Sequence, residues 1–448
     1  MFPNPQDALP LPSRPRIEQY RKLAKDLVKA CKSGDDAAIG TWADGWIAAL
    51  ARATGPGQRP RSRLEMDRAA GQVEEFAARK LKASGPSPCG LADAQFIIAR
   101  SHGFVSWPKF VEHLDRLAHG GSDAADFEAA ADAIASGDTE TLARLLRARP
   151  ALARVRSSRE HRATLLHYVS ANGVENYRQR TPENIVAVAR ILLDSGAEVD
   201  AEADVYGGGA TALGLVATSA HPRIAGVQIP LLQLLLDRGA QMERRGIAGR
   251  DHGIALACLA NGCPEAAAYL AERGARLGIV EAAGIGRLDV VKTFFDAQGN
   301  PAQGLAADVL HTAFGYACFY GRNEVAEFLI DRGVDLAGHS GDGQTGLHHA
   351  AMGGRLDTVK LLLRHRAPLE AVNEYDGTVL GQAVWSAAHA GKPDAYLPVI
   401  EALLAAGAKV RERHPPVSAE IDALLARYGS AADDSLRWFG QKPRTRKA

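Results

Sequence analysis

The chain has 448 residues, and its 53 Lys and Arg balance 52 Asp and Glu to leave a formal net charge of +1. This balance provides no global attraction to nucleic acid or to an anionic membrane surface. The five cysteines are odd in number and lack metal or redox spacing, so reduced core thiols are expected. No secretory signal and no apolar run of roughly 18 residues is visible. A cytoplasmic protein without membrane association is predicted.

The first 120 residues do not follow the repeat that organises the rest of the chain. Residues 1–15 are rich in Pro and are expected to be disordered. Residues 16–120 are predicted to form a small helical domain, because Ile17 to Ala30 places apolar residues on one helical stripe and Arg and Lys on the other. The basic face is interpreted as solvated. A DNA-binding helical domain is the sharper alternative, which the balanced charge of the chain disfavours.

A helical hairpin is predicted between Leu91 and Phe110. Its first helix ends at Gly103, Ser106 caps the second helix, and Pro108 lies in the first turn, where no N–H is needed. Large aromatic side chains are most often core residues. Phe104 is predicted to fill the turn, and Trp107 and Phe110 are assigned to the core, with ligand contact as the alternative.

Beyond residue 124, one helix ending recurs along the chain: a Leu-rich or Ala-rich turn followed by Gly and a small apolar residue. Its copies lie at residues 190–197, 234–240, 268–275, 328–334, 361–367 and 402–408. The Gly marks a left-handed exit from the helix, and Arg366 replaces it in one copy. The spacing clusters near roughly 33 residues, with longer gaps where loops are inserted, and gives about seven to eight units.

The clearest unit runs from Gly343 to Leu363. It reads as a β-turn, a helix start of the Thr-Pro-Leu-His-x-Ala type at Thr345, a short helix, a Gly break and a Leu-rich second helix. These repeats resemble those of bacterial ankyrin-repeat proteins over nearly two thirds of the chain, and the hairpin at residues 91–110 is similar to one at the N-termini of such proteins. The resemblance implies an all-α ankyrin-repeat solenoid, made of helix pairs with short β-turn fingers and preceded by a small helical domain. The resemblance implies a role in binding and does not imply any particular reaction.

The array is predicted to span residues 124–411. It opens with a helix pair that lacks the Thr-x-Leu-His start and suits an N-terminal cap. Residues 412–430 are predicted to be a C-terminal capping helix, and the polar, basic residues 431–448 are expected to be a disordered tail.

No enzyme signature is present: there is no H-E-x-x-H, no P-loop and no nucleophile elbow. We therefore assign no catalytic residue, metal site or cofactor, and a non-enzymatic role is favoured. His167 and His348 occupy the position at which ankyrin proteins use His to brace the turn. Other repeats carry Gly at this position, which leaves room beside the first helix; these are Gly214, Gly315 and Gly381.

Certain positions of the first helix normally face the concave groove of such an array. Aligning the repeats on them gives aromatic, His, Met and amide side chains, which suit an interaction hot spot or a small-molecule groove. The predicted groove residues are Tyr168, Asn172, Tyr316, Phe319, Tyr320, His349, Met352, Gln382 and Trp385. The alternative is that degenerate repeats need larger core residues, or that the alignment is off by one.

Two insertions, around residues 172–182 and 218–228, add polar side chains near one end of this groove. Because equivalent turns of successive repeats lie side by side, the inserted loops are expected to touch. A possible anion-binding cluster then comprises Tyr177, Arg178, Arg180, His221 and Arg223. The alternative is that these side chains satisfy Glu175, Glu183 and loop carbonyls.

The leading interpretation is a module that binds a protein partner through the concave groove. The alternative is an enzyme or small-molecule receptor with a site between the groove aromatics and the inserted loops. Its candidate residues are His349, Tyr168, Tyr177, Arg178, His221 and Trp385, with His349 or His221 as the acid–base group. A closed pocket with converging polar groups would favour this alternative.

Overall fold

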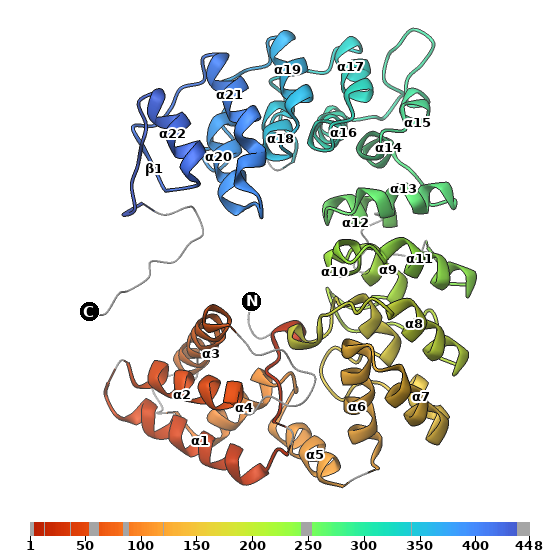
Figure 1. Ribbon diagram of the computed structural model, residues 1–448, viewed down its shortest axis with the longest axis vertical. Helices are drawn as coiled ribbons and strands as arrows, with labels where there is room; N and C mark the ends of the chain where they lie inside the picture. Colours follow the sequence, from red (N-terminus) through yellow and green to blue (C-terminus); the bar gives the residue numbers. More distant parts are fainter. Residues whose placement is uncertain are drawn as a thin grey trace. The chain divides into compact units, whose positions relative to one another are not determined.

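The computed structural model describes residues 4–12, 14–35, 37–52, 62–83, 89–119, 121–242, 253–341 and 343–436 (Figure 1). The chain divides into two compact units. The first holds residues 1–257 and 261–266, and the second holds residues 258–260 and 267–448. Helices dominate both, and the described residues contain only two strands, each of two residues. The expected all-α repeat architecture with a helical N-terminal region is confirmed. None of the described helices is long and apolar enough to cross a bilayer.

The described residues of the N-terminal region of the first unit form five α-helices around one apolar cluster. They are α1 (Ile17–Lys32), α2 (Ala38–Arg52), α3 (Arg63–Ala83), α4 (Leu91–Ser101) and α5 (Trp107–Ala118). The predicted stripe of α1 is buried at Tyr20, Ala24 and Leu27. Ser106 caps α5 by accepting from the Lys109 N–H, as the sequence predicts. Phe104 and Phe110 are fully buried in this cluster, which fixes the hairpin against α1.

Residues 4–12 differ from the expected disordered N-terminus. They include a 3-10 turn, η1 (Pro5–Asp7), which Asn4 caps. Ala8 and Leu9 are buried. The Leu9 N–H donates to the Ser101 carbonyl at 2.8 Å, and the Leu9 carbonyl lies 3.0 Å from His102 Nδ1. Burial of Ala8 and Leu9 and the hydrogen bond from Leu9 to Ser101 thus hold this segment in place. Its Pro content had predicted disorder.

Repeats of the first unit follow α5. Their elements are α6 (Asp123–Ser136), α7 (Thr139–Ala148), η2 (Pro150–Arg154), η3 (Leu165–Ser170), η4 (Asn176–Arg178), α8 (Ile185–Asp194), α9 (Ala212–Ala217), α10 (Ala220–Ile224) and α11 (Gln228–Asp237). The division between the units falls within α12 (Ile254–Ala260) and α13 (Pro264–Glu272). The Gly exits predicted from sequence are left-handed, for example Gly239 at φ 87°, and so is Arg366 at φ 58°.

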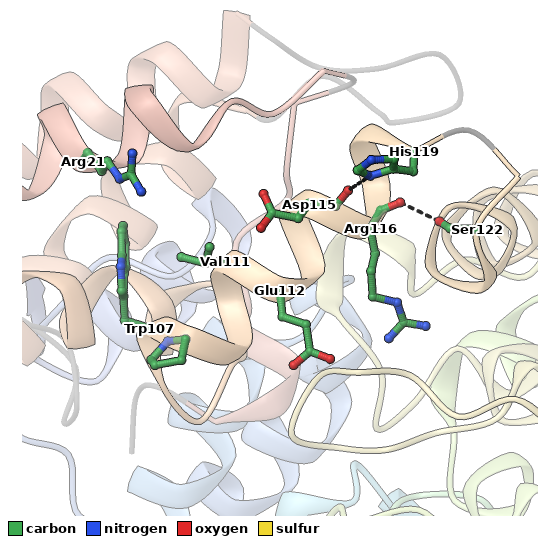
Figure 2. A pocket seen from close by; sticks show the side chains of 9 residues that line it. Arg21, Trp107, Val111, Glu112, Asp115, Arg116, His119 and Ser122 are labelled. Atoms are coloured by element: carbon green, nitrogen blue, oxygen red, sulfur yellow. Dashed lines mark hydrogen bonds between the residues drawn. The ribbon is translucent and has the colours of Figure 1, made fainter.

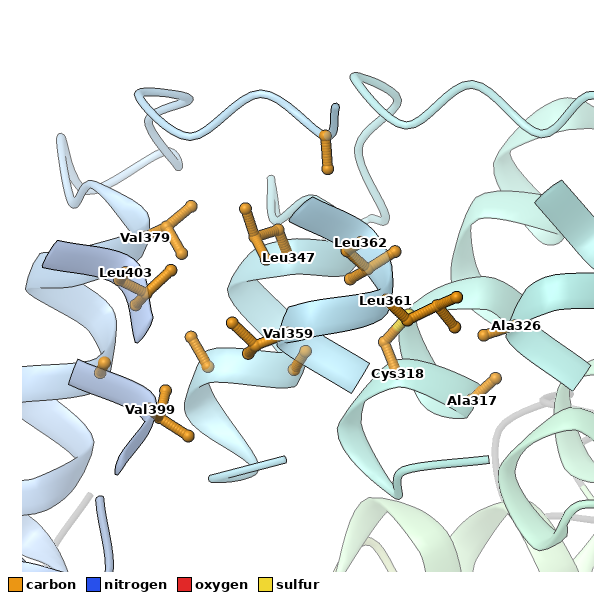
Figure 3. Close-up of a cluster of buried hydrophobic side chains, with 14 of the residues drawn as sticks. Ala317, Cys318, Ala326, Leu347, Val359, Leu361, Leu362, Val379, Val399 and Leu403 are labelled. Carbon is orange, nitrogen blue, oxygen red and sulfur yellow. The ribbon is translucent and has the colours of Figure 1, made fainter. Parts of the chain in front are cut away.

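The second unit continues the helix pairs and ends in a cap. Its elements are α14 (Ile279–Ile285), α15 (Leu288–Lys292), α16 (Ala307–Phe319), α17 (Asn323–Asp331), α18 (Gly346–Met352), α19 (Leu356–Arg364), α20 (Val379–His389), η6 (Pro393–Tyr396), α21 (Leu397–Ala405), β1 (Arg413–His414), α22 (Ala419–Arg427) and β2 (Ala431–Ala432). One apolar cluster runs through these helices, and Figure 3 shows Leu347, Val359 and Leu403 within it. The predicted disordered tail begins at residue 431, but its first two residues form β2, which pairs in parallel with β1. Residues 437–448 of this tail lie outside the described residues.

In two repeats a buried histidine ties the helix start to the following finger. His348 Nδ1 accepts the Thr345 N–H at 3.4 Å, and His348 Nε2 donates to the Gly377 carbonyl of the following finger at 3.1 Å. His167 repeats this arrangement, with its Nε2 3.1 Å from the Ala210 carbonyl. Both rings are fully buried. The bracing role predicted for these histidines is therefore observed.

Replacing His348 by Ala is expected to lower the free energy of unfolding by about 2–4 kcal/mol, because it leaves a cavity and an unpaired finger carbonyl. Chemical denaturation followed by circular dichroism measures this change. His365→Ala, in the exposed turn after α19, is the control and should change stability by less than about 0.5 kcal/mol. Equal effects of the two substitutions would show that the bridge does not stabilise the stack.

Candidate functional site

A cavity of about 700 Å³ lies at the C-terminal end of the second unit, and we name it the C-terminal pocket. This volume lies within the range of small-ligand and side-chain binding pockets. Three predicted groove residues line it: Met352, Gln382 and Trp385. The other lining residues are Gln344, Asn373, Tyr375, Gly377, Thr378, Leu380, Gly381, Val384, Lys409, Val410, Arg411, Arg413, His414, Pro415, Leu425, Ser430 and Leu436.

The finger before α20 forms one wall of the pocket. Asn373 shapes this finger, since its side-chain oxygen accepts the N–H groups of Tyr375 at 3.0 Å and Gly377 at 2.9 Å. Thr378 then caps α20 by accepting the Gly381 N–H at 3.1 Å. Tyr375, at the tip of this finger, is 62% exposed.

A second part of the lining is the segment at residues 409–415, which follows α21 and is hydrogen-bonded to the preceding finger. The Lys409 N–H donates to Glu370 Oε1 at 2.9 Å, and Arg411 Nη2 reaches the Asp376 carbonyl at 3.4 Å. Farther along, His414 lies between Ser430 Oγ, at 2.9 Å from Nδ1, and Asp422 Oδ1, at 3.1 Å from Nε2. This segment is therefore tied to both the finger and the C-terminal cap.

The Ser430–His414–Asp422 arrangement has the residue types of a nucleophilic site but lacks other requirements of one. Ser430 is only 3% exposed. The N–H groups of Ser430 and Ala431, which would have to stabilise an oxyanion, donate to the carbonyls of Leu425 and Glu412. We interpret the three side chains as a structural tie between β1, α22 and β2.

Other predicted groove residues of the second unit lie outside the pocket. His349 is 8% exposed, and its Nε2 is 2.9 Å from Ser340 Oγ. Its ring fills the space beside Gly315, where an added Cβ would lie 2.7 Å from His349 Cδ2. Tyr320 is 7% exposed, and its hydroxyl donates to the Leu259 carbonyl. Tyr316 and Phe319 are half-buried and lie against Tyr320.

In the first unit the two predicted groove residues do not form an open surface. Tyr168 is 1% exposed, and its hydroxyl donates to Glu175 Oε1 at 3.3 Å, so it is a core residue. Asn172 is half-buried, and its Oδ1 accepts from the Tyr206 hydroxyl at 2.5 Å. The N-terminal segment covers the adjoining loop, where Gln6 Oε1 accepts from Gln179 Nε2 at 3.0 Å.

Arg178, assigned by sequence to an anion-binding cluster, is turned inward instead. It is 3% exposed, and its Nη2 lies 2.8 Å from Glu128 Oε2. Its Nε lies 2.7 Å from Asp132 Oδ1, and its Nη1 lies 3.5 Å from Glu175 Oε1. Glu128 and Asp132, on successive turns of α6, thus supply most of the negative charge that neutralises the Arg178 guanidinium group. The alternative interpretation, in which the loop arginine satisfies internal carboxylates, fits this geometry.

Arg159 completes this buried ionic network. It forms an ion pair with Glu128 and another with Glu175 at 3.0 Å, and its guanidinium lies 5.7 Å from the centre of the Phe104 ring. Its Nη2 donates to the Tyr177 hydroxyl at 3.3 Å. The network therefore joins the N-terminal hairpin, the first repeat helix and the inserted loop. The two guanidinium groups lower the pKa of Glu128 to about 2, although burial opposes this shift.

The remaining members of the predicted anion cluster differ in exposure. Arg180 is half-buried and follows Arg178 in the inserted loop. His221 and Arg223 lie on α10 and are exposed. Because Arg178 already faces carboxylates, the structure gives no five-residue cluster aimed at an external anion.

A second cavity, of about 680 Å³, lies beside α1 and α5 in the N-terminal region (Figure 2). Trp107, predicted to be a core residue, packs partly on the core and also lines this cavity. The lining contains the cationic residues Arg21 and Arg116 and the acidic residues Glu112 and Asp115. Charges of both signs give this surface no preference for one class of charged ligand.

Comparison with known proteins bears on the second unit most directly. The family model described as "Ankyrin repeats (3 copies)" matches residues 315–414. The chain contains ankyrin repeats. A mouse protein described as "Protein fem-1 homolog A-like" is 37% identical over 60 residues, which are 13% of this chain and 9% of the relative's length. The ankyrin repeat domain of human ASB11 aligns with 63% of this chain and 99% of its own at 21% identity, with a TM-score of 0.34.

Among the described residues, no group of three His, Cys, Asp or Glu side chains is arranged to hold a metal ion. The residues proposed for an enzyme or receptor site are divided between the two units. Tyr168, Tyr177 and Arg178 belong to the buried network of the first unit, whereas His349 and Trp385 belong to the second. Sequence reasoning missed Lys409 and Arg411, because the pattern of the array weakens where its last finger begins.

Glu175→Gln is expected to lower the free energy of unfolding by about 3–5 kcal/mol, because it leaves buried Arg159 and Arg178 with too little negative charge. Urea denaturation measures the effect. Glu183→Gln, on an exposed side chain of the same loop, should cost less than about 0.5 kcal/mol. A small cost for Glu175→Gln would mean that the network contributes little to the junction.

Stability is expected to fall as pH drops from 7 to 5. Burial lowers the pKa values of His113 and His167 from 6.5 to about 4, so the unfolded chain binds protons that the folded chain does not. Each contribution is complete above pH 6.5 and is lost as pH falls towards 4, by about 2 kcal/mol per histidine at pH 5. Denaturation at pH 7, 6 and 5 measures it, and His113→Gln should flatten the slope. A pH-independent stability over this range would contradict the assignment.

Proposed function

We propose that the chain binds a protein partner, and that the partner docks on the second unit around the C-terminal pocket. Ankyrin repeats are protein-interaction modules, and extended arrays offer broad binding surfaces. The observation that carries the proposal is the convergence of three predicted groove residues, Met352, Gln382 and Trp385, on one cavity.

Exposed apolar side chains support this location. Val372, Tyr375 and Trp385 are 49%, 62% and 36% exposed, and the last two line the pocket. Trp and Tyr are enriched among the residues that dominate protein–protein binding energy. Large apolar groups that remain accessible beside a cavity mark an interaction surface more strongly than scattered ones do.

The buried network supports a structural role for the other predicted sites. Arg178 and Tyr168 are occupied by internal carboxylates, so a partner would have to break ion pairs to reach them. In the second unit Tyr375 and Trp385 are 62% and 36% exposed, so a partner can reach both side chains from solvent.

Affinity capture with the full chain as bait tests the proposal. Trp385→Ala should lose the bound partner, because truncating a hot-spot residue weakens binding by about tenfold or more. Tyr428→Ala removes another exposed aromatic side chain of the second unit that does not line the pocket. It should retain the partner. Recovery of the same proteins by the Trp385→Ala bait would overturn the proposed docking surface.

A further inference from the structure

The C-terminal pocket lies where one repeat lacks the bracing histidine. Gly381 follows Thr378 by three residues, as His348 follows Thr345, and both threonines cap their helices. In the earlier repeat the imidazole fills the space between its helix and the next finger. At Gly381 an added Cβ would meet only Thr378 Oγ1, at 3.3 Å. The missing ring leaves a slot beside α20 that opens into the pocket.

Absence of a bracing histidine does not by itself create a cavity. At Gly315 the ring of His349, from the following repeat, occupies the space. At Gly381 the following element is the irregular segment at residues 409–415, which lines the pocket. Its imidazole, on His414, is held between Ser430 and Asp422, and no atom of this segment lies within 4 Å of a Cβ added at Gly381. Gly214 also has open space, since an added Cβ there would meet only Thr211 Oγ1, at 3.6 Å, but Gly214 does not line this pocket.

The lining combines an apolar floor with a cationic wall. Leu380, Val384 and Leu425 are at most 5% exposed and form the apolar part of the lining. The wall carries Lys409 and Arg411, together with Arg413, whose Nη1 is paired with Asp433 at 2.9 Å. None of the residues that line the pocket is Asp or Glu. Among the described residues, no ion pair involves the Lys409 ammonium group.

We propose that the C-terminal pocket binds an acidic segment of a protein partner, which inserts a large apolar side chain into the slot beside Gly381. Lys409 and Arg411 would face carboxylates of the segment, while Trp385 and Tyr375 contact its apolar side chains. Charge complementarity selects this occupant, because a basic segment would meet a wall of like charge. The inference rests on the proposed protein-binding function and names the chemistry that the pocket recognises.

The probe is a fluorescein-labelled peptide, Asp-Leu-Asp-Phe-Asp-Leu-Asp, titrated with the full chain and followed by fluorescence anisotropy. Two matched peptides replace every Asp by Lys, or every Leu and Phe by Ser. The acidic apolar peptide should bind at least about tenfold more tightly than either control, since both the charge and the apolar anchor are required.

Gly381→His fills the slot with the ring that other repeats carry and should weaken binding of the acidic apolar peptide by about tenfold or more. Gly214→His makes the same exchange in the first unit and should leave the affinity unchanged. Thermal unfolding of both variants establishes that they are folded. Trp385→Ala provides a second test that does not depend on placing a ring in the slot.

Equal binding of the three peptides, or no effect of Gly381→His and Trp385→Ala, would overturn the proposal. The proposed function fails separately. If the acidic apolar peptide does not bind while affinity capture still depends on Trp385, the partner uses this surface without an acidic segment. If neither result is obtained, both the acidic segment and the docking surface are wrong.

Discussion

A buried imidazole bridge joins successive repeats at two places in this chain. The ring joins the start of one helix to the backbone of the next finger, and it does so at His167 and His348 with nearly the same distances. A buried ring that satisfies a buried carbonyl removes two penalties together, a void and an unpaired acceptor. Where the ring is missing, the space is either filled by a neighbour, as at Gly315, or left open, as at Gly381.

Different interactions stabilise the first and the last repeats of the described chain. At the first repeats, the helical N-terminal region is joined to the stack through a buried network in which Arg159 and Arg178 face Glu128 and Glu175. Such a network is strongly destabilised when one partner is removed, because the remaining charges stay buried. At the last repeat, a short parallel strand pair and α22 close the apolar cluster. The cap does not cover the slot beside Gly381. This slot can therefore bind a ligand, while the rest of the apolar cluster is shielded from solvent.

Local sequence patterns predicted the parts of the fold that local physics determines. Helix caps such as Ser106 and Thr345, and left-handed exits such as Gly239 and Arg366, follow from hydrogen bonds and dihedral angles within a few residues. The role of His348 followed from its place in the repeat. The ordered residues 4–12 could not be predicted this way, because their anchors lie on α4, about ninety residues away along the chain.

Site residues were harder to predict, since burial depends on neighbours distant in sequence. Tyr168 and His349 occupy positions that face a groove in regular repeats, yet each contacts a polar partner that buries it. Arg178 was read as a ligand for an external anion, but its main carboxylate partners lie on α6, nearly fifty residues earlier. Trp385 was placed in a groove by the alignment and lines the C-terminal pocket.

The C-terminal pocket is attributed here to Gly381, which stands where other repeats carry a bracing histidine. A crystal structure of the Gly381→His variant is the measurement to make first. We expect the new imidazole to accept the Thr378 N–H through Nδ1, to donate through Nε2 to a backbone carbonyl of the segment at residues 409–415, and to occupy the slot. A ring turned to solvent beside an unchanged cavity would contradict the account.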